Sequence, residues 1–106
     1  MKRQYIITAP ADCDIDSHFS YIDQQNHSAA VRFLRAAEAS YEKLAVMPEL
    51  GQRQEFSREG LADLRAWQVR GFENFIIYYR IIENGIEIVR VLHAARDQEA
   101  VFNDES

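Results

Sequence analysis

The residues best suited to chemistry are arginines and a histidine in the last third of the chain. Arg80 and Arg90 each interrupt an apolar run, in FIIYYRII and IEIVRVL, and His93 follows the second run. A guanidinium holds a carboxylate or a phosphate through two parallel hydrogen bonds. Histidine is the side chain used most often as a general acid or base. These residue types predict either recognition of an anionic partner or a small acid–base site.

The chain has ten arginines and only two lysines. Five of the arginines fall in the expected late strands or at their ends: Arg65, Arg70, Arg80, Arg90 and Arg96. A charge on an apolar strand face needs a partner, because an unpaired buried charge is costly. Two interpretations stay open. The arginines pair internally with Glu73, Glu87 or Asp97, or they pair with carboxylates of a binding partner.

Other polar clusters are weaker candidates. DCDID has alternating carboxylates but lacks the glycine and the twelfth-position glutamate of a calcium loop. We therefore expect Asp12, Asp14 and Asp16 to complement a helix N-terminus. His18 and His27 are expected at the surface. No metal site and no cofactor is predicted.

Apolar periodicity locates the elements that must position these residues. Strands are expected at 4–8, 64–69, 75–82 and 86–92. Helices are expected from Pro10 to about residue 25 and from Ser28, as N-cap, to the residue before Pro48. Residues 48–63 read as a loop, Asn84-Gly85 as a type I′ turn and 97–102 as a last helical turn.

This β-α-α-β-β-β order predicts one α+β domain over residues 1–106, an antiparallel sheet with a helical hairpin packed on one face. Trp67, Tyr78 and Tyr79 are expected in the core or on a sheet face. In the last two strands both side-chain parities are mostly apolar, and two helices can cover only one face. Apolar surface on the second face is left for the C-terminal segment or for a partner.

Composition limits the function. The chain has 106 residues and a net charge of −5. Because nucleic-acid binding usually needs a basic surface, we expect no direct DNA binding. No apolar run is long enough to span a membrane, and no signal peptide is recognisable. Cys13, the only cysteine, is expected to be a small, partly buried residue, and its isolation suits a reducing cytoplasm.

Four stretches occur in order along the chain: P-x-x-G at 48–51, L-R at 64–65, G-F-x-x-F-x-I-x-Y-R at 71–80 and I-x-R-V-L-H-x-x-R-D at 88–97. Together they resemble the ParE branch of the RelE/ParE toxin superfamily, over nearly the whole chain. The resemblance implies the toxin of a type II toxin–antitoxin module. A ParD-like antitoxin would neutralise it, and DNA gyrase would be its target.

RelE-type toxins of the same superfamily cut mRNA on the ribosome. Here Arg65, Arg90 and His93 could form a minimal site of that kind. However, lysine is absent after Lys43, the tail DQEAVFNDES is acidic, and the net charge would repel ribosomal RNA. These features favour a non-enzymatic ParE-like inhibitor. A binding module without toxicity is a third reading.

An antitoxin would dock through an amphipathic helix and an extended stretch, the common modes of peptide recognition. Its carboxylates would pair with Arg65, Arg80 or Arg90. The residues expected to contact it are Arg65, Tyr79, Arg80, Arg90, His93 and Arg96.

Overall fold

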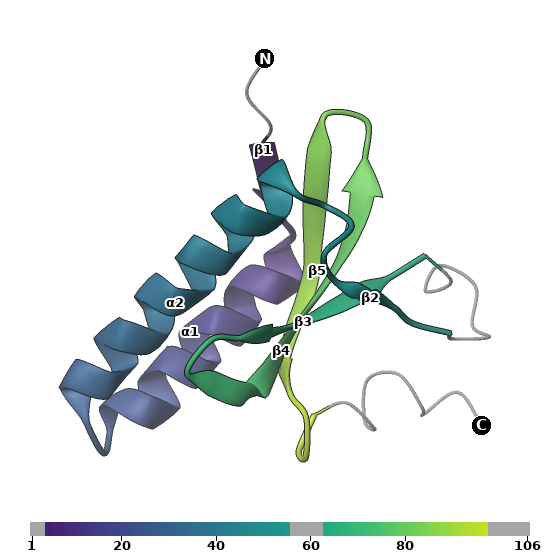
Figure 1. Ribbon diagram of the computed structural model, residues 1–106. Helices are drawn as coiled ribbons and strands as arrows, with labels where there is room; N and C mark the ends of the chain where they lie inside the picture. Colours follow the sequence, from purple (N-terminus) through teal and green to yellow (C-terminus); the bar gives the residue numbers. More distant parts are fainter. Residues whose placement is uncertain (1–3, 56–62, 98–106) are drawn as a thin grey trace.

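The structure is a computed structural model that describes residues 4–55 and 63–97. Two helices lie together on one side of a twisted sheet (Figure 1). The elements, in chain order, are β1 (Gln4–Ile7), α1 (Ala9–Asp23), α2 (His27–Val46), β2 (Gln52–Arg53), β3 (Arg65–Val69), β4 (Phe72–Ile82) and β5 (Gly85–His93). The α+β class and the predicted order of the main elements are confirmed.

The helical hairpin begins at side-chain caps. The Thr8 hydroxyl accepts a hydrogen bond from the Ala11 N–H at 3.2 Å, and Pro10 lies in the first turn of α1. At α2 the N-cap is Asn26, whose side-chain oxygen accepts from the Ala29 N–H at 2.9 Å. The prediction of Ser28 as N-cap is therefore wrong. The extended backbone of Asn26 starts the helix earlier, so Ser28 lies inside its first turn.

The sheet has the order β1-β5-β4-β3-β2. The predicted antiparallel meander is confirmed for β3, β4 and β5, but β1 pairs with β5 in parallel, so the sheet is mixed. The helical hairpin supplies the long crossover that a parallel pair requires. β2 is a two-residue strand inside the stretch predicted as a loop, too short to show a periodic pattern.

A bulge explains why both parities of β5 are apolar. Tyr78 pairs with Arg90 and Tyr79 pairs with Ile88, which leaves Val89 as an extra residue. Ile88 before the bulge and Val91 after it therefore both face the helices. The alternation read from the sequence is interrupted at this point.

Each face of the sheet has its own core. The helix side holds the large cluster, including Phe33, Leu44 and Ile77. The second face has a small cluster of Leu64, Tyr78 and Leu92, each at most 2% exposed. That face is thus partly closed within the chain. Ala66, Ile76 and Val89 are its partly buried members.

The turn between β4 and β5 differs from the predicted one. Ile82 pairs with Gly85, so the two central residues are Glu83 and Asn84. Asn84 has a negative φ, which excludes a type I′ turn. Gly85 is needed for another reason: a Cβ there would collide with the carbonyl oxygen of Gln4 in β1. Of the helical turn predicted at 97–102, only Asp97 lies within the described residues.

Candidate functional site

β5 extends beyond the end of β1. Past that point, side chains from Thr8 and from α1 form hydrogen bonds with the backbone of β5. The Asp14 carboxylate accepts a hydrogen bond from the Val91 N–H at 3.0 Å. His18, one helical turn later, contacts the Val91 carbonyl oxygen through Nε2 at 2.8 Å. Thr8 donates its hydroxyl to the Val89 carbonyl at 2.9 Å. Polar side chains thus satisfy the part of the β5 edge that lies beyond β1.

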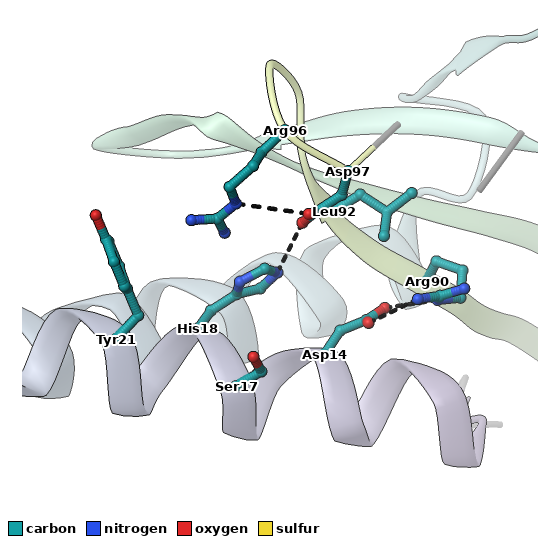
Figure 2. A pocket seen from close by; sticks show the side chains of 8 residues that line it. All are labelled: Asp14, Ser17, His18, Tyr21, Arg90, Leu92, Arg96 and Asp97. Atoms are coloured by element: carbon teal, nitrogen blue, oxygen red, sulfur yellow. Dashed lines mark hydrogen bonds and ion pairs between the residues drawn. The ribbon is translucent and has the colours of Figure 1, made fainter. Parts of the chain in front are cut away.

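Arg90 joins the same cluster. Its Nε and Nη2 donate to the two oxygens of Asp14 at 2.7 and 2.8 Å, a bidentate pair shown in Figure 2. The hydrogen bond with Asp14 raises the pKa of Arg90. From the sequence, Asp14 was expected only to complement a helix N-terminus, and its pairing with Arg90 was not predicted. The helical spacing of Asp14 and His18 was the available signal.

A hollow of about 300 Å³ opens beside this cluster, between α1 and the end of β5. Tyr21 and Arg96 lie at its rim, with the guanidinium 5.3 Å from the phenol ring (Figure 2). Asp97 accepts a hydrogen bond from the His93 N–H at 2.9 Å and lies 3.5 Å from Arg96. Its other neighbour is His18 Nε2, at 4.0 Å.

Two groups of the hollow have shifted pKa values. Burial lowers the pKa of His18, and its contacts with the Val91 carbonyl and Asp97 offset this only in part. Burial raises the pKa of Asp97, but the His93 N–H and Arg96 outweigh it, so the net pKa is low. His18 is only 4% exposed, so the prediction of a surface residue is wrong, whereas His27 is exposed as expected. A neutral His18 whose Nε2 donates to a carbonyl has a structural role.

Arg65 and Tyr79 hold the loop after α2. The Tyr79 hydroxyl donates to the Pro48 carbonyl at 2.7 Å and accepts from the Gly51 N–H at 2.8 Å. Arg65 donates to the Gly51 carbonyl at 2.8 Å. A Cβ on Gly51 would overlap the end of the Tyr79 side chain, so a larger residue here would displace that ring. Both predicted site residues are therefore used to position the loop.

Arg80 lies between two carboxylates. Its Nε is 3.2 Å from Asp63 and its Nη1 is 3.3 Å from Glu87, the cross-strand neighbour on β5. Internal pairing with Glu87 was one of the two interpretations left open. His93 packs edge-on against Phe75 at 5.1 Å between ring centroids.

The three residues considered for RNA cleavage do not converge. Arg65 points to the loop after α2, Arg90 binds Asp14 on α1, and His93 packs on Phe75. Cys13, expected to be partly buried, is exposed instead. Within residues 4–55 and 63–97 no group of acidic, histidine and cysteine side chains could hold a metal ion. No described helix is long and apolar enough to cross a membrane.

Comparison with known proteins agrees with this architecture. Residues 5–98 match the family described as "ParE toxin of type II toxin-antitoxin system, parDE". The chain belongs to the ParE toxin family. A solved structure titled "Chromosomal ParDE TA system from P. aeruginosa" shares the ParE fold with a TM-score of 0.70 at 15% identity, covering 86% of this chain and 95% of that chain. No curated protein sequence matches significantly.

The ParE match includes the six residues predicted to contact an antitoxin. In this ParE-family chain Arg65, Tyr79 and Arg90 already have internal partners. The side chain of Arg96 is 45% exposed, compared with 27% for Arg80 and for Arg90. Assignment of these residues to an antitoxin interface stays a prediction.

Proposed function

We propose that this ParE-family toxin inhibits DNA gyrase by binding it and is itself neutralised by a ParD-like antitoxin. The main support for a non-enzymatic action is that Arg65, Arg90 and His93 contact different parts of the chain and do not form one site. Cleavage of mRNA needs groups that activate the 2′-hydroxyl, stabilise the phosphorane and protonate the leaving oxygen within a few ångströms of one another. Here the side chains suited to those tasks contact other parts of the chain.

The overall charge also favours a non-enzymatic inhibitor over a toxin that cuts mRNA. A net charge of −5 repels ribosomal RNA, whereas it does not prevent binding to a protein surface. Of the predicted contact residues, Arg96 is the better candidate for an antitoxin carboxylate, because its side chain is 45% exposed and its contact with Asp97 is long, at 3.5 Å. Arg80 is less exposed, at 27%, and already contacts both Asp63 and Glu87.

Two parallel assays test the proposal. The purified toxin is added to a gyrase supercoiling reaction and to ribosomes programmed with mRNA. We expect supercoiling to be inhibited, the antitoxin encoded beside the toxin to restore it, and the mRNA to stay intact. Cleavage of mRNA at the ribosome, without loss of supercoiling, would contradict the proposal and favour a RelE-like nuclease.

A further inference from the structure

Positive side chains without a carboxylate partner occur on α2 and just after β3. All of them are exposed: Arg32, Arg35, Lys43 and Arg70. None of the four forms an ion pair with a residue that the structure describes. By contrast, Arg80, Arg90 and Arg96 each lie near an aspartate or glutamate. The chain thus neutralises the arginines of its last two strands and of the segment after them, but leaves these four charges without a counter-ion.

Helical spacing places the α2 cations on one face. Arg35, Ala39 and Lys43 follow one another at intervals of four residues, and Arg32 lies one turn before Ala36. The two alanines lie between the cations, so a partner can approach the helix closely there. We call the surface formed by these five residues and Arg70 the basic face.

A hollow of about 260 Å³ lies within the basic face. Residues from α2 and from the end of β3 line it: Ala36, Ala39, Ser40, Lys43, Trp67 and Arg70. The Lys43 ammonium lies 5.5 Å from the centre of the half-buried Trp67 ring. Pockets for small molecules usually measure about 300–1,000 Å³. A smaller hollow of this kind suits one apolar side chain of a protein partner.

The acidic side chains of α2 lie on its other flank. Burial raises the pKa of the Tyr5 phenol, and the nearby carboxylates of Glu42 and Glu38 raise it further. Tyr5 belongs to β1 at one edge of the sheet, whereas Trp67 belongs to β3, beyond β5 and β4. The charges of α2 are therefore segregated, negative toward β1 and positive toward β3. Segregated charge of this kind fixes the orientation of a bound partner.

A basic surface complements either nucleic acid or an acidic protein. The whole chain carries a net charge of −5, which opposes close approach of a phosphate backbone. The hollow beside Trp67 adds an apolar contact that phosphates cannot use. None of the six residues predicted to contact an antitoxin lines this hollow. These observations favour an acidic protein surface, and a partner other than the antitoxin.

We propose that the basic face is the surface through which the toxin binds gyrase. Carboxylates on the enzyme pair with the four cations, and one apolar side chain enters the hollow beside Trp67. This inference rests on the proposed inhibition of gyrase. Attraction between opposite charges speeds the encounter, and the close pairs then set the register of the complex.

Charge reversal tests the assignment. Lys43→Glu and Arg70→Glu should each weaken the binding of toxin to gyrase by about tenfold, as measured by surface plasmon resonance. Arg53→Glu is the matched control: Arg53 is also an exposed arginine beside β3, but it does not line the hollow. It makes the same change of charge and should alter the affinity less than about twofold.

Two further measurements separate this interface from effects on the fold or on the antitoxin. Thermal unfolding should show that the exposed positions tolerate the substitutions, and binding of the antitoxin encoded beside the toxin should change less than about threefold in each variant. The affinity of the wild-type toxin for gyrase should fall between about 50 and about 200 mM salt, because screening weakens exposed ion pairs.

Equal gyrase affinity of the wild type, Lys43→Glu and Arg70→Glu would overturn the inference while leaving gyrase as the target. The same holds if Arg53→Glu weakens binding as much as they do, or if binding does not depend on salt. Variants that lose the antitoxin and keep gyrase would assign the basic face to the antitoxin instead. A wild-type toxin that does not bind gyrase would overturn both this inference and the proposed function.

Discussion

Two residues on α1 form hydrogen bonds with the edge of β5, as a neighbouring strand would. Asp14 and His18 are four positions apart, so they project from the same side of the helix and reach the N–H and C=O of a single residue, Val91. The same carboxylate neutralises Arg90. Arg90, for which the sequence left both an internal and an outside partner open, is thereby paired within the chain. Buried or half-buried groups joined in this way are sensitive to the loss of one member.

Asp14→Ala should lower the free energy of unfolding by about 2–3 kcal/mol. It leaves the Arg90 guanidinium and the Val91 N–H without their acceptor, and both are at least partly desolvated. Asp16→Ala is the matched control, because this exposed aspartate lies two positions further on the same helix. Urea denaturation of both variants measures the difference. Equal, small losses would mean that the Asp14 contacts contribute little.

His18 should make the fold sensitive to mild acid. Burial lowers its pKa in the folded state below the ordinary value of 6.5, so the unfolded chain binds the proton more readily. The stability from neutral His18 is complete above pH 6.5 and declines as the pH falls below that value. Asp97 and Asp14 favour the protonated ring and Arg96 opposes it, so these neighbours set how far the decline extends.

Thermal unfolding at pH 7.5 and 5.5 checks this expectation. The wild type should lose more stability between the two values than His18→Gln, which cannot titrate but can still donate a hydrogen bond. Asp97 contributes in a lower range, because its folded pKa lies below 3.8. The same loss in both proteins would assign the pH dependence to other groups.

The position of β1 in the sheet depends on Gly85, a residue of the neighbouring strand β5. β1 has only four residues, and among the described strands it pairs only with β5. Its Gln4 carbonyl lies against Gly85 at the start of β5, so close that no Cβ fits there. The glycine next to the turn thus permits the parallel pair that places β1 at the edge of the sheet.

Gly85→Ala should destabilise the protein by about 2–3 kcal/mol, because β1 must shift away from β5 to admit the methyl group. Gly71→Ala is the control. It also has a positive φ, of 84°, but a Cβ there meets nothing within 4 Å, so it should cost only about 1–2 kcal/mol of backbone strain. Amide exchange at Ile6 separates the two, since only Gly85→Ala should expose that amide.

At the scale of the whole molecule, charge and fold together restrict the partners. The protein carries a net charge of −5, and its described arginines at 80 and 90 are paired with carboxylates rather than arranged as a basic surface. One sheet face is covered by the helices, and exposed large apolar side chains occur on α1, β1 and β4 and where α2 ends. Such a surface suits protein partners better than nucleic acid.

The free toxin should accordingly fail to bind duplex DNA. In a gel-shift assay at 150 mM salt, we expect no retardation of a DNA fragment at protein concentrations of about 10 μM, because few phosphates would be neutralised. Lysozyme, a basic protein of similar size, serves as the positive control. Salt-dependent retardation by the toxin would refute this expectation.

The sequence by itself determined the class, the main elements and the family resemblance. These follow from local spacing: apolar residues at helical intervals in α1 and α2, β-branched and aromatic runs in β4 and β5, and motifs in fixed order. Strand and helix positions agreed within a few residues because the apolar pattern itself specifies which face of each element is buried.

Only the tertiary structure decided which residues meet. Asp14 and Arg90 are 76 positions apart, and Val89 forms a bulge that reverses the side-chain pattern of β5. The parallel pairing of β1 depends on where the helical hairpin returns the chain. Contacts between distant segments cannot be recognised from periodic patterns in the sequence, because each contact depends on how whole elements pack. The arginines were rightly identified as charges that need partners, but only the fold showed that Arg90 finds its partner in α1.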